Sequence, residues 1–254
     1  MPSQRRVLVL VPFPMDAGNL EKRRAQMSAV KLGPNISFDF RPVSIAPINY
    51  VSQQDMLLAD IGMVEAGHRA EEEGYDAVCI DTVSDSGMTA LRSVLSIPVI
   101  GAGRHAILMA LMLGERFSFV SMWDRWRPLY EKTLAELGLA GKCASMRSAD
   151  LQPNNQSLLA DREAEVFPVL LETAKRCVEE DRADVIILGS TTMHEAHAFL
   201  AANLSVPVIN PGPLTYRLAD AAIRLKLSHS KTTYPTPLVP RLDLFEAMGA
   251  TVRN

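Results

Sequence analysis

The feature that most constrains the fold is a strand–turn–helix unit that occurs twice in the chain. Asp76–Gly87, with the sequence DAVCIDTVSDSG, has the pattern of a buried strand that ends in a turn of small polar residues before a helix. Asp184–Met193, with the sequence DVIILGSTTM, repeats this pattern. Each copy is followed by a short helical stretch and a second apolar strand, Ile97–Ile100 or Val206–Ile209. The repeat therefore predicts two related halves.

Strands alternate with helices along the rest of the chain. Further strands are predicted at 7–11, 36–43 and 117–122, with a short one near 142–146. Helices are predicted at about 19–32, 55–73, 86–95, 106–114, 124–137, 157–181, 192–203, 213–226 and 242–248. This alternation predicts an α/β fold of two similar lobes, each a mostly parallel doubly wound sheet flanked by helices and related by pseudo-two-fold symmetry. We expect residues 1–105 and 206–254 in lobe 1, 106–205 in lobe 2, and an active-site crevice between them.

Composition excludes several classes of partner. The net charge is −3 and Lys and Arg do not cluster, so neither nucleic acid nor an anionic membrane is an expected partner. The chain shows no signal-peptide pattern and no apolar run long enough to span a bilayer, which predicts a cytoplasmic protein. We expect a homo-oligomer formed through exposed apolar helices and the Pro-rich tail. Cys79, Cys143 and Cys177 lack metal-type spacing and are predicted to be structural thiols.

No cofactor or metal is expected from the local motifs. His194 and His197 are three residues apart, whereas the zinc-binding helix motif needs histidines four apart and a third ligand. Gly101-Ala-Gly103 is not followed by the third glycine of a dinucleotide-binding fingerprint. The expected ligand is therefore a small molecule held by protein groups alone.

Ligands of doubly wound sheets collect where the strands end and the helices begin, because helix N-termini offer N–H groups and a positive dipole. Four segments meet this condition: Pro12–Gly18, Asp81–Gly87, Gly101–His105 and Gly189–Glu195. The hydroxyl groups in them suit a carboxylate or a urea-like carbonyl, although each of these residues also suits plain helix capping. These hydroxyls belong to Thr82, Ser84, Ser86, Ser190, Thr191 and Thr192.

Over nearly its whole length, the sequence resembles the aspartate/glutamate/hydantoin racemase superfamily, and most closely its hydantoin and allantoin racemase branch. That branch carries Cys-Phe-Gly-Asp-Pro-Gly-Leu where this chain has Thr82–Met88, TVSDSGM. Its second signature, Leu-Gly-Cys-Ala-Gly-Met, corresponds to Leu188–Met193, LGSTTM. Asp85, Gly87, Gly189 and Met193 keep the pattern, so the resemblance implies the fold and the location of the site.

The resemblance also implies a reaction. Members of the superfamily racemise with two cysteines, one thiolate removing the proton next to a carbonyl and the other thiol returning it from the opposite face. Thr82 and Ser190 occupy these two positions here, and a hydroxyl is a far weaker acid than a thiol. The family's first-strand Asn-Pro-Asn is replaced by Pro12-Phe13-Pro14.

Acidic and imidazole groups next to these hydroxyls are the candidate bases. The alternatives are that Asp85 caps a helix, that Glu195 and His197 are solvated, and that His194 stacks between the lobes. Arg104 and His105 open a helix, where either can bind a carboxylate or remain in solvent. The expected catalytic residues are Thr82, Ser190, His194 and Asp81, and the expected substrate-binding residues are Pro12, Phe13, Tyr50, Ser84, Asp85, Thr191, Thr192 and Arg104.

Three functions remain open at this point. The first is an isomerase of racemase type acting at the carbon next to a carbonyl of a small carboxylate or cyclic ureide, without the usual cysteine pair. The second is a hydrolase or lyase that opens or decarboxylates a similar substrate, with Ser190 activated by His194 or an acidic neighbour. The third is a binding protein that kept the pocket and lost catalysis.

Overall fold

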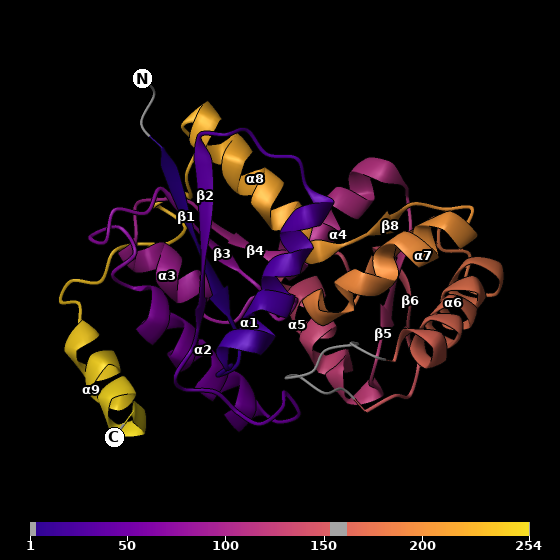
Figure 1. Cartoon of the computed structure of the whole chain (residues 1–254), viewed down its shortest axis with the longest axis horizontal. Coiled ribbons are helices and arrows are strands. Elements are labelled where there is room, and N and C mark those ends of the chain that lie inside the picture. The colour runs from indigo at the N-terminus through magenta and orange to yellow at the C-terminus, as the bar shows by residue number, and fades with distance from the viewer. Residues whose placement is uncertain (1–3, 153–161, 254) are drawn as a thin grey trace. The chain divides into compact units, whose positions relative to one another are not determined.

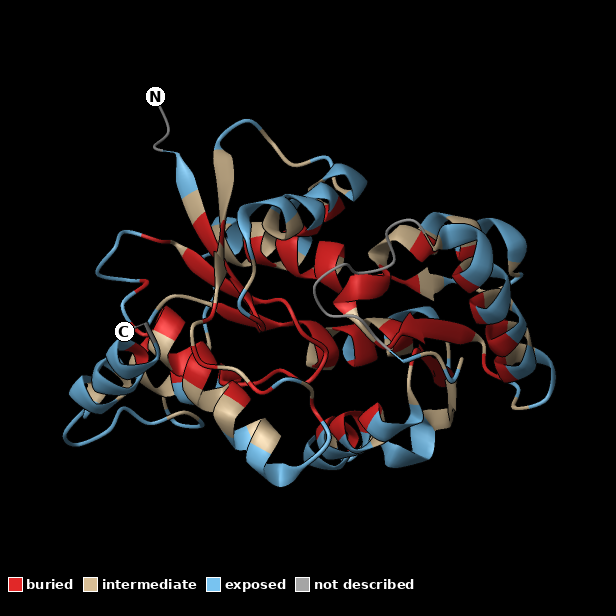
Figure 2. Cartoon of the chain, turned by 60° about the horizontal axis from the view of Figure 1, so that its bottom comes forward, coloured by how far each residue is buried: buried red, intermediate tan, exposed pale blue. Residues whose placement is uncertain are grey.

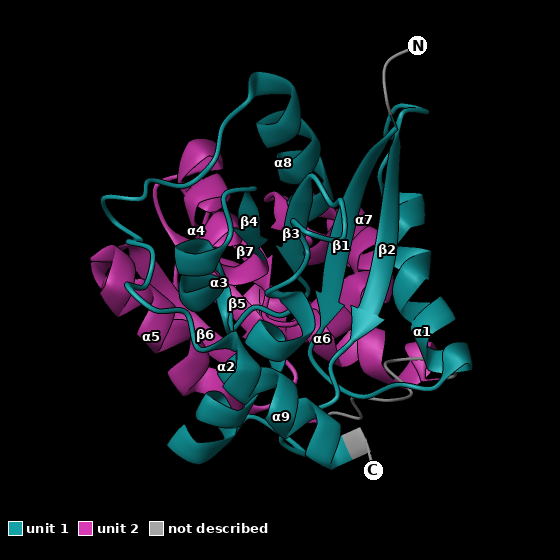
Figure 3. Cartoon of the chain, turned by 90° about the vertical axis from the view of Figure 1, so that its left-hand side faces the viewer, with its two compact units in different colours: residues 1–101, 215–254 teal, residues 102–214 magenta. Residues whose placement is uncertain are grey.

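The computed structural model describes residues 4–152 and 162–253, which fold into two compact units (Figure 3). Unit 1 consists of Met1–Gly101 and Thr215–Asn254, and unit 2 of Ala102–Leu214. The predicted boundaries at 105/106 and 205/206 differ from these. Strand β8 (Val208–Ile209) pairs with β7 (Val185–Leu188), and this backbone pairing places residues 206–214 in unit 2 instead of lobe 1.

Unit 1 is built on a parallel four-stranded sheet in the order β2-β1-β3-β4. Its strands are β1 (Arg5–Val11), β2 (Ile36–Pro42), β3 (Ala77–Ile80) and β4 (Val99–Gly101) (Figure 1). Its helical elements are α1 (Ala17–Arg24), the 3₁₀ helix η1 (Ala25–Ala29), α2 (Gln53–Gly67), α3 (Met88–Val94), most of α8 (Pro211–Leu225) and α9 (Leu242–Arg253). The central strand β1 has five consecutive buried residues, as expected of a strand covered on both faces.

Side-chain alternation along the strands divides the core of unit 1 into two layers. Leu8 and Ile80 belong to the layer that packs against α2 and α3. Val9 and Cys79 belong to the opposite layer, which includes Tyr216 of α8. The doubly wound arrangement predicted for this half is therefore confirmed, and the central strands β1 and β3 are buried along most of their length (Figure 2).

Unit 2 repeats the same topology. Its parallel sheet has the order β6-β5-β7-β8, made from β5 (Phe117–Ser121), β6 (Cys143–Ser148), β7 and β8. Its helices are α4 (Ala102–Leu113), α5 (Arg127–Leu137), α6 (Glu163–Glu179) and α7 (His197–Asn203), with 3₁₀ helices η2 (Asp124–Trp126), η3 (Ala140–Lys142) and η4 (Thr191–Ala196). Two four-stranded parallel sheets of equivalent strand order confirm the predicted fold class.

Several element boundaries differ from the sequence expectations. The predicted helix at 192–203 begins as the 3₁₀ helix η4 and becomes α-helical at His197. The final helix extends to Arg253, beyond the predicted end at 248. Part of the predicted helix at 157–181 lies outside the described residues, and α6 begins at Glu163. Within the described ranges, no helix is long and apolar enough to cross a membrane.

Candidate active site

The turn after β3 carries three hydroxyl groups joined by hydrogen bonds. Thr82 Oγ1 lies 3.1 Å from Ser84 Oγ, which lies 2.8 Å from Ser86 Oγ. The backbone N–H of Ser84 also donates to Thr82 Oγ1 at 3.4 Å. All three residues are buried. Such a chain polarises its members, because each hydroxyl that donates becomes a better acceptor.

The backbone of this turn is held by α2 and by the end of β4. Gly87 has a φ of +71°, and its N–H donates to Asp60 Oδ1 at 2.8 Å. A Cβ at Gly87 would lie 2.5 Å from Met63 Cβ, so only glycine lets the turn approach α2 this closely. Asp85 is buried with a φ of +52°, and its carboxylate packs against Gly101. This conformation places Asp85 inside the turn.

Asp81 connects the start of this turn to α1 and η1 through buried contacts. Its side chain is 1% exposed, and its Oδ2 lies 3.2 Å from Nε of Arg23, which is also 1% exposed. Gln26 Nε2 donates to the same Oδ2 at 3.0 Å, and Arg23 Nη2 donates to the Asp81 carbonyl at 3.1 Å. Because these contacts fix both its carboxylate and its backbone, the geometry favours a positioning role for Asp81 next to Thr82.

An aromatic pair lies beside the first turn. Pro12 and Phe13 follow β1 and are buried, and the Phe13 ring meets Tyr50 edge to face at 5.3 Å. The pKa of Tyr50 is raised, first by burial and then by the Asp60 carboxylate, whereas Thr82 acts in the opposite direction. The Tyr50 hydroxyl is buried and makes no hydrogen bond of good geometry to any described residue. A protonated phenol therefore lies close enough to Thr82 for that hydroxyl to influence its pKa.

The cysteines are not available as bases in this arrangement. Cys79 faces the layer of the core opposite to its neighbours in β3, as alternation predicts, and its Sγ donates to the Thr215 carbonyl at 3.6 Å. Burial raises the pKa of Cys79 to about 12. Burial likewise raises the pKa of Cys143 to about 11 and increases that of Cys177. The predicted structural role fits all three thiols.

The turn after β7 repeats the hydroxyl arrangement in unit 2. Ser190 caps η4, accepting from the Thr192 N–H at 3.2 Å, and the two side-chain oxygens are 2.8 Å apart. Thr191 and Thr192 are buried, and Ser190 is half-buried. Tyr130 Oη donates to the Gly189 carbonyl at 2.8 Å and would clash with a Cβ at that glycine. In both units a hydroxyl at the end of the strand bonds to another two residues later.

The histidines of this segment have different surroundings. His194 and Glu195 lie in η4 and are half-buried, with His194 Nε2 and Glu195 Oε2 shielded from solvent. His197 donates from Nε2 to the Val208 carbonyl at 3.0 Å, which ties α7 to β8. Arg104 and His105 lie in the first turn of α4 and are half-buried. Of these residues, His194 is the imidazole carried by the same turn as Ser190.

Three residues that contact the two turns, and one buried amide after β8, were not predicted from the sequence. Arg23 and Gln26 contact Asp81 across 58 and 55 positions, and Tyr130 contacts Gly189 across 59. No local pattern marks such distant partners. The fourth is Asn210, a buried amide directly after β8, which is followed by the sequence Pro-Gly-Pro.

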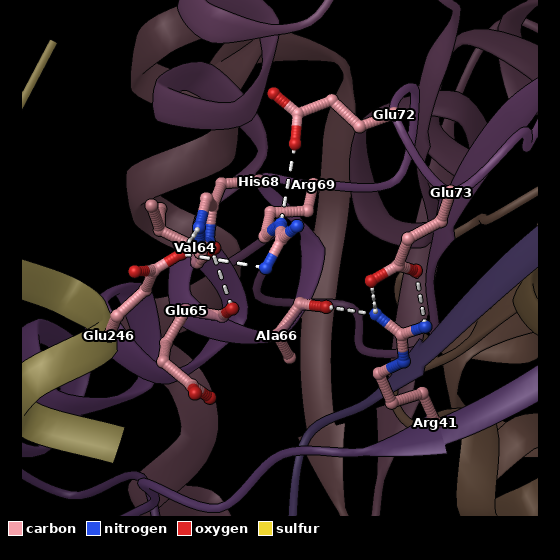
Figure 4. A network of polar contacts seen from close by, with 9 residues as sticks. All are labelled: Arg41, Val64, Glu65, Ala66, His68, Arg69, Glu72, Glu73 and Glu246. Atoms are coloured by element: carbon pink, nitrogen blue, oxygen red, sulfur yellow. Dashed lines mark hydrogen bonds and ion pairs between the residues drawn. The ribbon is translucent and has the colours of Figure 1, made fainter. Parts of the chain in front are cut away.

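A separate polar cluster in unit 1 lines a hollow of about 430 Å³. Figure 4 shows the polar contacts within this cluster. Arg41 forms an ion pair with Glu73 and donates to the Ala66 carbonyl at 2.8 Å. His68 contacts Glu246 of α9 at 3.3 Å. Arg69 lies near Glu72 and Glu246. Because the arginines are matched by carboxylates, we interpret this cluster as an ionic link between β2, the segment directly after α2, and α9.

Comparisons with known proteins agree with this architecture. The family model for Asp/Glu/hydantoin racemase matches residues 22–219. A hydantoin racemase of Paenarthrobacter aurescens is 30% identical over 236 residues, covering 91% of this chain and 97% of the relative. A hydantoin racemase of Pseudomonas sp. (strain NS671) is 31% identical over 195 residues, covering 76% of this chain and 77% of the relative. The allantoin racemase structure from Klebsiella pneumoniae superposes with a TM-score of 0.83 at 26% identity, covering 93% of this chain and 95% of that one. Topology, turns and sequence similarity together establish that the chain belongs to the Asp/Glu/hydantoin racemase family.

Proposed function

We propose that this protein is a racemase-type isomerase acting at the carbon next to a carbonyl of a small carboxylate or cyclic ureide. The observation that carries the proposal is the matched pair of hydroxyl-bearing turns, Thr82 with Ser84 and Ser190 with Thr192, at the carboxyl ends of equivalent strands. Family membership and relatives named hydantoin and allantoin racemase support the reaction type.

Thr82 is suited to donate a hydrogen bond to the substrate carbonyl. If Ser86 donates to Ser84 and Ser84 donates to Thr82, Thr82 Oγ1 accepts from a hydroxyl and from the Ser84 N–H. The hydroxyl proton of Thr82 is then not used within this chain of hydroxyls and can be donated to the substrate. Tyr50 supplies a second donor, since its raised pKa keeps the phenol protonated at neutral pH. Donors held in place for the oxygen of a developing enolate stabilise the transition state more than the ground state.

Proton removal requires a different group, because an aliphatic hydroxyl is not a resting base. His194 follows Ser190 by four residues, and imidazole titrates close to neutral pH. In the proposed reaction, the carbon–hydrogen bond breaks, the proton moves to the His194 ring, and the electron pair passes to the carbonyl oxygen. A solvent water molecule then gives a proton to the other face of the planar enolate, which inverts the configuration, and His194 loses its acquired proton to the hydroxide or to solvent, which restores the site.

The test follows the substrate proton by NMR in deuterated water, with a panel of hydantoins, allantoin, aspartate, glutamate and arylmalonates. We expect exchange of the proton next to the carbonyl, reduced about 10²- to 10³-fold in Thr82→Ala and about 10²- to 10⁴-fold in His194→Gln. Ser190→Ala is expected to slow exchange as well. Ser93→Ala, which removes a half-buried hydroxyl of α3 that donates to the Ala90 carbonyl, is the matched control. Absence of exchange with every compound would contradict the proposal.

A hydrolase or lyase is the second candidate, and the observation in its favour is that Ser190 and His194 share one turn. In that reaction the Ser190 hydroxyl, activated by His194, attacks a carbonyl, or the site decarboxylates a malonate. The same NMR samples distinguish the two reactions, because ring opening or decarboxylation creates a new compound without prior exchange. A ligand that raises the unfolding temperature and is recovered unchanged would instead indicate a binding protein.

A further inference from the structure

Asn210 has an unusual environment in unit 2. It directly follows β8 and is only 8% exposed, yet its Oδ1 accepts no hydrogen bond from any described residue. A buried amide oxygen without a donor is unfavourable, because folding removes its bonds to water and returns nothing. Native proteins keep such groups rarely, and each calls for a physical explanation.

Helix capping does not explain this side chain. Asn210 precedes α8, where asparagine commonly accepts a hydrogen bond from the N–H of the second or third helical residue. Pro211 and Pro213 take two of the first three helical positions, and proline has no N–H. The Asn210 backbone carbonyl accepts the Leu214 N–H at 3.3 Å, so the main chain begins the helix while Oδ1 remains an acceptor.

The position of Asn210 in the sheet brings it next to the second turn. Ile209 is paired with Ile187, which places Asn210 level with Leu188, two residues before Ser190. Neighbouring strands are about 4.8 Å apart, and each residue advances the strand by about 3.3 Å. This spacing puts the Cα atoms of Asn210 and Ser190 at roughly 8 Å. A ring of a few atoms is large enough to contact both side chains.

From this placement we propose that Asn210 is a substrate-binding residue whose side-chain carbonyl accepts a hydrogen bond from an N–H of the substrate. The inference rests on the proposed function and narrows its substrate class to compounds with an amide or urea N–H beside the reacting carbonyl. Simple carboxylates have no such donor, and their negative oxygens are repelled by Oδ1. The ligand N–H would restore the hydrogen bond that the folded chain leaves unmade.

The experiment measures binding by calorimetry, so it does not depend on turnover. The probes are a 5-substituted hydantoin, the analogue with oxygen in place of the N–H beside the reacting carbon, and the analogue methylated on the other nitrogen. The proteins are wild type, Asn210→Ala and the control Asn203→Ala, which alters an exposed amide of α7. One of the two analogues lacks the N–H that Asn210 accepts, and wild type and control are expected to bind the hydantoin roughly tenfold or more tightly than that analogue. Asn210→Ala is expected to bind the hydantoin and that same analogue with affinities within about twofold of each other.

Thermal unfolding of Asn210→Leu provides a second readout. If Asn210 serves the ligand, an apolar replacement is expected to leave the unfolding temperature unchanged or raised while weakening hydantoin binding. A lowered unfolding temperature would assign Asn210 a structural role and overturn the inference. If wild type binds the probes and Asn210→Ala still prefers the hydantoin to the analogue that lacks the N–H, only the inference fails. If wild type binds none of them, the cyclic-ureide function and the inference fail together.

Discussion

Arg23 and Asp81 form an ion pair in which each side chain is only 1% exposed, with 3.2 Å between Nε and Oδ2. Arg23 belongs to α1, whereas Asp81 directly follows β3 and precedes Thr82. The pair therefore connects a helix to the turn that carries the first site hydroxyl. Because both charges are buried, removal of either partner leaves the other uncompensated.

We expect Asp81→Asn or Arg23→Met to lower the free energy of unfolding by about 3–5 kcal/mol. Urea denaturation measures the change. The matched control is Arg5→Ala, which breaks the Arg5–Asp76 pair, whose side chains are 50% and 26% exposed, and it is expected to cost under about 1 kcal/mol. Equal effects in the two pairs would show that burial adds nothing to the Arg23–Asp81 contact.

Gly87 and Gly138 separate backbone strain from steric clash. Both have a positive φ, +71° and +68°, but a Cβ at Gly87 meets Met63 Cβ at 2.5 Å, whereas nothing lies within 4 Å of one at Gly138. Gly138→Ala is expected to cost about 1 kcal/mol, and Gly87→Ala at least about 2 kcal/mol more because the turn must move off α2. Unfolding midpoints compare the two variants, and indistinguishable values would contradict the clash.

Restoring thiols at the two turns tests the role of the replaced positions. A cysteine has a pKa of about 8.5 and forms a reactive thiolate far more readily than a hydroxyl. Thr82→Cys combined with Ser190→Cys is expected to speed exchange of the substrate proton at least about tenfold, with a rate that rises as the thiols ionise. Cys79 contributes nothing to this profile, because its pKa is about 12. A double variant no faster than the control Ser93→Cys, which places one thiol on α3, would oppose the assignment.

Asp181 gives a pH-dependent contribution to stability. Arg147 Nη2 donates to Asp181 Oδ1 at 2.8 Å, and this ion pair lowers the pKa of Asp181 below its ordinary value. The contribution is complete above the unfolded-state pKa of about 3.9 and is lost as the pH falls through the lower folded-state pKa. Asp181→Asn is therefore expected to cost roughly 1 kcal/mol at pH 7, and less as the pH falls below 4. Urea titrations across this range measure the difference, with Glu131→Gln, an exposed change in α5, as the control.

A cost of Asp181→Asn that stays constant down to pH 2 would show that the ion pair is not its source. A cost that grows as the pH falls would contradict the sign of the shift in the Asp181 pKa.

Local patterns in the sequence were sufficient for the fold class and for the location of the turns. The apolar run at 7–11 identifies the core of β1, and the repeat at Asp76–Gly87 and Asp184–Met193 identifies β3 and β7 with their polar turns. These features are predictable because hydrophobic periodicity and turn residues act over a few neighbouring positions. The helix at 192–203 was harder to predict, since Ser190 caps the 3₁₀ segment Thr191–Ala196 before the α-helix begins at His197.

The sequence by itself thus determined two parallel α/β halves with hydroxyl-bearing turns, together with the family resemblance. Only the tertiary structure decided that Asp81 is paired with Arg23 and Gln26, that Tyr130 bonds to Gly189, and that the oxygen of Asn210 is buried without a donor. The physical reason is that these properties depend on which side chains from distant segments pack together. Burial then turns an ordinary polar residue into an anchor or a ligand-binding group, because an unmet hydrogen bond or charge is costly away from water.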